Sequence, residues 1–336
     1  MVIRSTVIVA GTVLVWMVCN ALIAESNRVL FSIMGFRYPA LLGTCQMIAA
    51  YTMSGIILAL KGGTAPETKA VQPACKDRAT TTKPMRPWTR ERAWVVPAAY
   101  CSSIVLNDFG LKYVFPSFFK ALSACTALVT MLLAVLVQGK RYHAHAYFSM
   151  VPLGVGVIVC TVTGDLEHTG IGALCCGTAV VLNGVRSVAQ DMLVHNCEGG
   201  ALSPMRLLFY MSRLSILVLF TWCMITERSQ IMEDPKTYLP QTWAMISASS
   251  TLAVGIHLAT LLVTFYTSAV TLQVLVLLQA VASGIFSVAV WHRQVPLRAI
   301  AGACATVVGV ILYTRAPRSG FADPVVQLVR KLMMKN

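Results

Sequence analysis

The most constraining feature of this sequence is an uncharged stretch of twenty residues, Thr267–Phe286, which reads TSAVTLQVLVLLQAVASGIF. At a rise of about 1.5 Å per residue, a helix of this length crosses the roughly 30 Å hydrocarbon core of a bilayer. Backbone amides in lipid must be satisfied within the segment, which favours a helix. Two amide side chains, Gln273 and Gln279, lie inside it. Because an amide that faces lipid is costly, each of them should face another helix or a polar path.

Similar stretches recur along the chain, and the composition is that of a polytopic membrane protein. Hydrophobic residues make up 57% of the 336 residues and charged residues only 12%, about half of the roughly 25% charged residues usual in soluble domains. The net charge of +14 does not indicate a nucleic-acid partner, because the basic residues gather in a few loops between apolar runs. No phosphate-binding glycine loop, zinc-protease motif or nucleophile elbow occurs. No enzymatic activity, cofactor or metal site is therefore expected.

The apolar runs predict an all-α membrane protein with ten transmembrane helices. The loop 61–92 is rich in Lys, Arg, Pro and Thr and is predicted to be solvated. Placing both termini and this loop in the cytosol puts 17 Lys and Arg residues on the cytosolic side and 7 on the other, as the positive-inside rule requires. Residues 317–336 are predicted to form a cytosolic amphipathic tail. The ten spans are expected at about 5–24, 39–60, 93–113, 116–138, 144–163, 170–193, 205–226, 242–265, 268–290 and 296–314.

Similar residues recur 153 positions apart, which indicates an internal repeat. The pairs are Tyr113 and Tyr266, Lys140 and Arg293, and Gly156 and Gly309. Since each half holds five spans, an odd number, the second half must enter the membrane upside down. The sequence therefore predicts two inverted five-helix repeats, residues 1–165 and 166–316. Secondary transporters of this architecture hold their solute between the halves, near the membrane midplane.

Several segments together resemble the triose-phosphate/nucleotide-sugar translocator family of the drug/metabolite transporter superfamily. They are TSAVTLQVL and AGACATVVGVILYTRA in the last two spans, LKYVFPSFFKAL at the third and fourth, SNRVLFSIMGFRYPALLGTCQ after the first, NGVRSVAQDML in the sixth and LSPMRLLFYMSRLS in the seventh. The resemblance covers roughly residues 10–316. It implies a ten-helix antiporter that exchanges a nucleotide sugar or sugar phosphate for a nucleotide monophosphate or phosphate. It also implies the Golgi or endoplasmic reticulum membrane, with a plastid-type membrane as the alternative.

The chain departs from the family pattern at sites that concern the solute. Gln279 stands where the family commonly has a lysine in a Gly-Asn-x-Lys-Gly element. The family lysine of the fourth span falls on Ser123, and Lys120 lies one helical turn away on nearly the same face. Tyr210 belongs to Phe-Tyr-Met-Ser, where members that bind guanine nucleotides tend to have Phe-Tyr-Asn-Asn. His257 takes the place of a frequent Asn.

Arg186 is the strongest candidate for a solute-binding residue. It lies deep within the span 170–193, and a mid-span arginine is costly unless it faces protein or water. It either binds phosphate bidentately or pairs with an acidic residue. Asp191, at i+5, lies off its face and is poorly placed for such a pair.

The other candidates each have a structural alternative. Lys120 either joins the site or reaches to the membrane interface. Tyr210 could stack on a base or sugar but is also a common interfacial residue, and His257 could couple protons or bond a neighbouring helix. Gln279 is expected to face the path and Gln273 to join helices.

The predicted protein is thus an antiporter whose central site combines Lys120, Arg186, Tyr210, His257 and Gln279. Its expected partners are a phosphorylated sugar or nucleotide sugar and the lipid bilayer, with a homodimer left open. Two alternatives remain, namely a transporter of a less anionic metabolite, which the missing lysines favour, and a membrane interaction or regulatory protein without transport.

Overall fold

The computed structural model describes residues 2–60, 94–110, 122–140, 142, 144–161, 170–194, 203–234, 239–291 and 297–315. All regular structure within these residues is helical. The predicted loop 61–92, the predicted tail 317–336 and Lys120 lie outside them.

Long helices form both halves of the chain. The first half contributes α1 (Val2–Arg28), α2 (Pro39–Leu60), α4 (Val95–Gly110), α6 (Thr126–Gln138) and α7 (Ala144–Thr161). The second contributes α8 (Gly170–Val194), α9 (Pro204–Thr226), α11 (Pro240–Tyr266), α12 (Ala269–Trp291) and α13 (Leu297–Arg315). A π-helical turn, η1 (Val29–Ile33), follows α1, and the short α10 (Arg228–Glu233) follows α9. Each predicted span overlaps one of the long helices.

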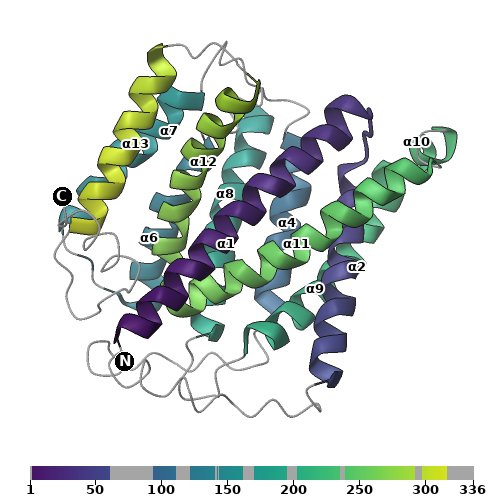
Figure 1. Ribbon diagram of the computed structural model, residues 1–336, viewed down its shortest axis with the longest axis horizontal. Coiled ribbons are helices and arrows are strands. Elements are labelled where there is room, and N and C mark those ends of the chain that lie inside the picture. The colour runs from purple at the N-terminus through teal and green to yellow at the C-terminus, as the bar shows by residue number, and fades with distance from the viewer. Residues whose placement is uncertain are drawn as a thin grey trace.

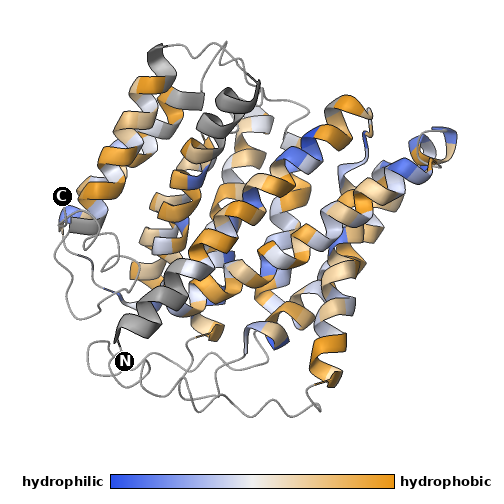
Figure 2. Ribbon diagram, in the orientation of Figure 1, coloured by the Kyte–Doolittle hydropathy of each residue, from blue (hydrophilic) through white to orange (hydrophobic). Residues whose placement is uncertain are grey.

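Length and hydropathy identify membrane spans among the described helices. Five segments qualify, Gly11–Phe31, Pro39–Leu60, Gly170–Val194, Pro204–Thr226 and Pro240–Tyr266, and shorter apolar helices accompany them. Large apolar side chains point outward from the bundle, including Leu136, which is 79% exposed, and Ile225, which is 72% exposed. Figure 2 shows apolar residues along the long helices and polar residues at α10. The prediction of an all-α, multi-span membrane protein is confirmed, and the count of ten crossings stays a prediction.

The helices pair across the two halves of the chain. The main pairs are α7 with α13, α2 with α9, α4 with α8, and α1 with α11. In Figure 1, α1 and α11 cross in front, α4 and α8 lie behind them, and α7 and α13 stand together at one edge. If the halves are related by a two-fold axis, α7–α13 and α2–α9 map onto themselves, and α4–α8 maps onto α11–α1.

Two glycines bring α7 and α13 into close contact. A Cβ atom added to Gly156 would lie 2.5 Å from the backbone nitrogen of Thr306, and one added to Gly309 would lie 2.7 Å from that of Leu153. Leu153 and Thr306 are themselves 153 positions apart, as are the two glycines. Each residue of the Gly156–Thr306 contact is therefore replaced, at a spacing of 153, by a residue of the Gly309–Leu153 contact. A two-fold relation between the halves requires this exchange. The repeat boundaries, residues 1–165 and 166–316, stay predictions.

Helices α4 and α8 pack antiparallel in one register along their length. Three pairs mark this register: Gly110 approaches Cys176, Ser103 bonds Asn183, and Tyr100 contacts Arg186. The two residue numbers of each pair have the same sum, as expected for antiparallel helices that keep one register. This pair of helices carries the centre of the candidate site.

A buried carboxylate caps α2 from another helix. The Glu227 side chain, at the end of α9, accepts the backbone N–H groups of Ala40 at 2.9 Å and Leu41 at 3.0 Å. The first turn of α2 contains no acidic residue of its own. The negative charge of Glu227 therefore satisfies two orphan donors and complements the positive end of the α2 dipole.

Replacing Glu227 with Gln should lower the free energy of unfolding by about 1–2 kcal/mol. The amide has one acceptor oxygen where the carboxylate has two, and its NH₂ group would face a backbone donor. Glu233→Gln is the matched control, because Glu233 is an exposed residue of α10 and loses the same charge. Thermal unfolding of the purified variants measures the difference. Equal transition temperatures for the two variants would contradict this role of Glu227.

Candidate functional site

Arg186 lies in the middle of α8 and projects toward α4. Its guanidinium carbon sits 5.1 Å from the centre of the Tyr100 ring, over the aromatic face. Its Nε atom is buried and has no hydrogen-bond partner among the described residues. A cation at this depth is stabilised by the π-electrons of the ring, and its N–H donors remain open to an acceptor that enters the site.

His257 joins this arrangement from α11. Its ring lies 6.0 Å from that of Tyr100 and is perpendicular to it. Tyr100 therefore contacts two predicted site residues on two different helices, and we call Arg186, Tyr100 and His257 the central cluster. Two predicted residues, Arg186 and His257, come together in it.

Polar side chains continue from the central cluster in one direction along α4 and α8. Ser103 donates to the Asn183 side chain at 3.3 Å, one turn from Tyr100 and Arg186. One turn further along α4, the Oδ1 atom of Asn107 is buried with no partner in the described part of the chain. On this side of the central cluster, the contact between α4 and α8 is therefore polar.

In the opposite direction, apolar side chains pack between the same helices. Leu193 of α8 belongs to a buried cluster with Val96 of α4, Leu207 and Leu208 of α9, and Leu261 of α11. These apolar side chains therefore connect α4, α8, α9 and α11. Toward the C-terminal end of α8, the described contacts are therefore apolar.

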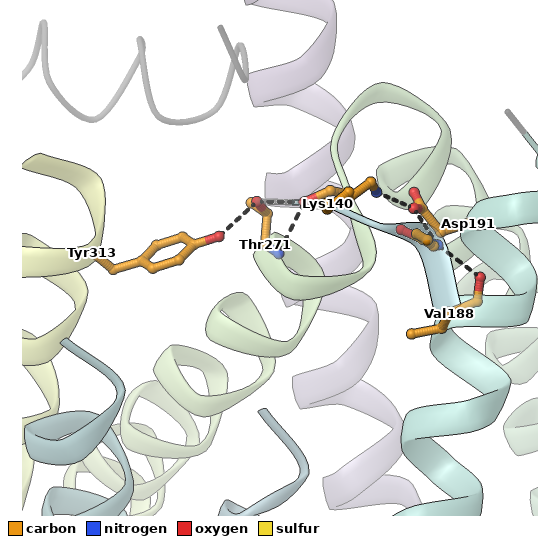
Figure 3. Close-up of polar contacts among 7 residues, drawn as sticks. Lys140, Val188, Asp191, Thr271 and Tyr313 are labelled. Atoms are coloured by element: carbon orange, nitrogen blue, oxygen red, sulfur yellow. Dashed lines mark hydrogen bonds and ion pairs between the residues drawn. The ribbon is translucent and has the colours of Figure 1, made fainter. Parts of the chain in front are cut away.

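Arg186 does not pair with Asp191. The carboxylate of Asp191 instead binds Lys140, just beyond α6, with 2.5 Å between Nζ and Oδ2, and accepts the Gln138 amide at 3.0 Å. Figure 3 shows this ion pair together with the contact between the hydroxyl groups of Thr271 and Tyr313. The sequence predicted poor pairing between Arg186 and Asp191, and the structure confirms it, with the negative charge of Asp191 already neutralised by Lys140.

Replacing Lys140 with Met should lower the free energy of unfolding by about 1–3 kcal/mol, because it leaves the Asp191 carboxylate, whose side chain is 3% exposed, without its cation. The lower part of this range allows for the 23% exposure of the Lys140 side chain. The double variant Lys140→Met/Asp191→Asn should recover part of the loss. Thermal unfolding of both single variants and of the double variant completes the double-mutant cycle. Purely additive losses of stability would contradict a direct pairing of Lys140 and Asp191.

Gln273 and Gln279 of α12 lie in different surroundings, and those of Gln273 agree with the prediction. Its amide nitrogen donates to the Ser187 hydroxyl at 2.7 Å, which ties α12 to α8 beside Arg186. The prediction that Gln273 joins helices is confirmed. Gln279 is buried, with 9% of its surface exposed, and no described contact joins it to the central cluster.

Tyr210 belongs to a different aromatic group. Its ring contacts that of Phe209 at 6.1 Å, and Phe209 stacks on Tyr51 of α2 at 4.7 Å. These rings form part of the α2–α9 interface. The described contacts therefore do not bring Tyr210 to Arg186, and its role in the site stays a prediction, as does that of Lys120.

Tyr100 is the residue that the sequence interpretation missed. Nothing in its local pattern distinguishes it from other tyrosines near membrane interfaces. The available signal was the need of a mid-span arginine for a partner. That signal identifies Tyr100 only once the pairing and register of α4 and α8 are known.

The fold and the central cluster define a multi-span α-helical membrane protein with a cationic side chain among its helices. Comparison with known proteins specifies the group further: the chain belongs to the Triose-phosphate Transporter family, whose sequence profile matches residues 7–314. The resemblance stated from the sequence is confirmed.

Individual relatives agree with this assignment. A probable sugar phosphate/phosphate translocator of Arabidopsis thaliana is 28% identical, over 92% of this chain and 95% of the relative. UDP-uronic acid transporter 1 of the same plant is 27% identical, over 94% and 97%. Solute carrier family 35 member E4 of Homo sapiens is 27% identical, over 91% and 79%.

A solved crystal structure shares the fold. It matches with a TM-score of 0.65 and 17% sequence identity, over 93% of this chain and 97% of the other.

Proposed function

We propose that this protein is an antiporter that moves a nucleotide sugar or sugar phosphate across an internal membrane in exchange for a nucleotide monophosphate or phosphate. The observation that carries the proposal is the Arg186 guanidinium, whose Nε atom is buried within the helix bundle. It has no carboxylate partner among the described residues, and the nearest acid on its own helix toward the C-terminus, Asp191, is bound to Lys140. A phosphate group supplies the missing negative charge and accepts two parallel N–H bonds.

The names of the relatives support this class of solute. They include a probable sugar phosphate/phosphate translocator and a UDP-uronic acid transporter. We assign Lys120, Tyr210, His257 and Gln279 to the same site as secondary contacts. The Golgi apparatus and the endoplasmic reticulum are the proposed locations.

Exchange in proteoliposomes tests the proposal. Purified protein is reconstituted into vesicles loaded with inorganic phosphate, uridine monophosphate or buffer, and uptake of labelled UDP-glucose, UDP-glucuronic acid, glucose 6-phosphate and phosphate is measured. The expected result is uptake of at least one phosphate-bearing solute that depends on a phosphate-bearing solute inside. Uptake into buffer-loaded vesicles at the same rate would contradict antiport.

One observation favours a second candidate, a transporter of a less anionic metabolite. Gln279 is an uncharged residue where the family commonly has a lysine, which reduces the number of cations available to a solute. In that case glucose itself or another neutral sugar, added to the same panel, would be taken up in preference to its phosphate ester. Uptake of no solute by folded protein would favour the role without transport.

The proposed orientation places both termini and the loop 61–92 in the cytosol. A thiol reagent that cannot cross membranes should then label Cys75, within this loop, in sealed organelle vesicles whose cytosolic face is outward. A Cys75→Ser variant is the control for labelling at other cysteines. Labelling of Cys75 only after the vesicles are made permeable would reverse the orientation.

A further inference from the structure

Tyr100 lies between two residues of the candidate site, Arg186 and His257. Its face lies under the Arg186 guanidinium at 5.1 Å, and its ring contacts His257 at 6.0 Å with an interplanar angle of 90°. The ring also packs against the apolar cluster of Met47, Cys101 and Leu219. Tyr100 is therefore held from three sides, by α8, by α11 and by apolar contacts from α2 and α9.

The kind of contact between Tyr100 and Arg186 matters for binding. A carboxylate would hold the guanidinium by using its N–H donors and cancelling its charge. An aromatic face attracts the same cation through the ring quadrupole and uses no donor. The Arg186 Nε atom accordingly has no partner among the described residues although it is buried. The ring therefore holds the guanidinium while its charge and its Nε–H donor stay available.

The packing of α4 on α8 fixes the ring opposite the guanidinium. The Ser103–Asn183 bond of 3.3 Å lies one turn to one side of the pair. Further along, a Cβ atom on Gly110 would lie 2.5 Å from Sγ of Cys176, so the helices approach closely there. Because these contacts share one register, α4 cannot slide along α8 without loss of all of them.

We propose that Tyr100 is a positioning residue that holds Arg186 by its aromatic face and keeps its N–H donors directed toward the phosphate group of the solute. This inference rests on the proposed function, since it takes Arg186 as the anion-binding residue. It assigns to Tyr100 an effect on phosphate affinity that acts through Arg186 and depends on the π-electrons of the ring rather than on its hydroxyl.

The test separates the ring face from the hydroxyl and from general stability. Dissociation constants of the purified protein for inorganic phosphate and uridine monophosphate are measured in wild type, Tyr100→Phe, Tyr100→Leu and a variant with trifluorophenylalanine at position 100. The fluorinated ring keeps nearly the same shape but has lost most of its negative face. Ser103→Ala is the matched control, because it removes an α4–α8 bond one turn away and leaves the ring in place.

The expected results are specific to the ring. Tyr100→Phe should keep the affinity within about twofold, and both Tyr100→Leu and the fluorinated variant should weaken it about three- to thirtyfold. Ser103→Ala should lower the unfolding temperature without a comparable loss of affinity. If Tyr100→Leu does not fold, the Phe and fluorinated variants still decide the question.

Two pairs of outcomes overturn different parts of the proposal. Equal affinity of the Phe and fluorinated variants, or loss of affinity in Tyr100→Phe as large as in Tyr100→Leu, overturns the role of the ring face while leaving Arg186 in place. Full affinity in a folded Arg186→Gln protein, or a wild-type protein that binds neither probe, overturns the proposed function itself.

Discussion

Replacing Arg186 with Gln should weaken the binding of phosphate-bearing solutes about ten- to a hundredfold. The change removes a charge-assisted hydrogen bond of about 1.5–3 kcal/mol from a site where no other described side chain neutralises the incoming anion. Asp191 does not bear on this loss, because its carboxylate remains bound to Lys140. The measurement is the dissociation constant for uridine monophosphate and inorganic phosphate in purified, folded protein.

Arg213→Gln provides the matched control. Arg213 is the same residue type in a neighbouring helix, α9, but it is exposed at the surface of the bundle. Its replacement should leave the dissociation constants within about twofold, since no described contact joins Arg213 to the central cluster. Similar losses in both variants would mean that net charge, not the position of Arg186, controls affinity.

Replacing Gly309 with Ala should destabilise the protein by about 2–3 kcal/mol, the upper part of the range for overpacked cores. The new methyl group would lie 2.7 Å from the backbone nitrogen of Leu153 and 2.9 Å from its Cα. Backbone atoms cannot turn away as a side chain can, so α7 and α13 would have to separate. Gly156→Ala should behave alike, because its methyl group meets Thr306 at 2.5 Å.

Gly154→Ala is the control for this prediction. Gly154 lies on the same helix as Gly156, and a Cβ atom there would meet nothing within 4 Å. Alanine is the better helix former by about 1 kcal/mol, so this variant should be neutral or more stable. Thermal unfolding of the three variants gives the comparison, and equal stability of Gly309→Ala and Gly154→Ala would show that the close α7–α13 contact is not maintained in the membrane.

Much of the architecture follows from the sequence because lipid leaves few choices. Long uncharged runs must be helical in a bilayer, and each predicted span overlaps a described helix, with ends that agree within a few residues except at the start of the span 116–138. The spacing of 153 residues identified Gly156 and Gly309 before their contact was known. Small residues mark close helix packing, which is why this local signal carried over into the structure.

The candidate site was less predictable, since its geometry depends on which helices meet. The cost of a buried charge identified Arg186, and the off-face position of Asp191 excluded their pairing. Lys140 could not be assigned as the partner of Asp191 from the sequence, because the contact depends on the packing of α6 against α8. Tyr100 was missed for the same reason, as its role depends on the α4–α8 register.

In the proposed exchange, the charge of Arg186 also affects the step in which the carrier turns over without cargo. Passing from one open side to the other requires a state closed to water on both sides, where an uncompensated guanidinium costs several kcal/mol. A penalty of about 4 kcal/mol would slow this return about a thousandfold. A bound phosphate group removes the penalty in either direction. Strict coupling of inward and outward flux is therefore expected from the electrostatics of one residue, without a separate mechanism that senses occupancy.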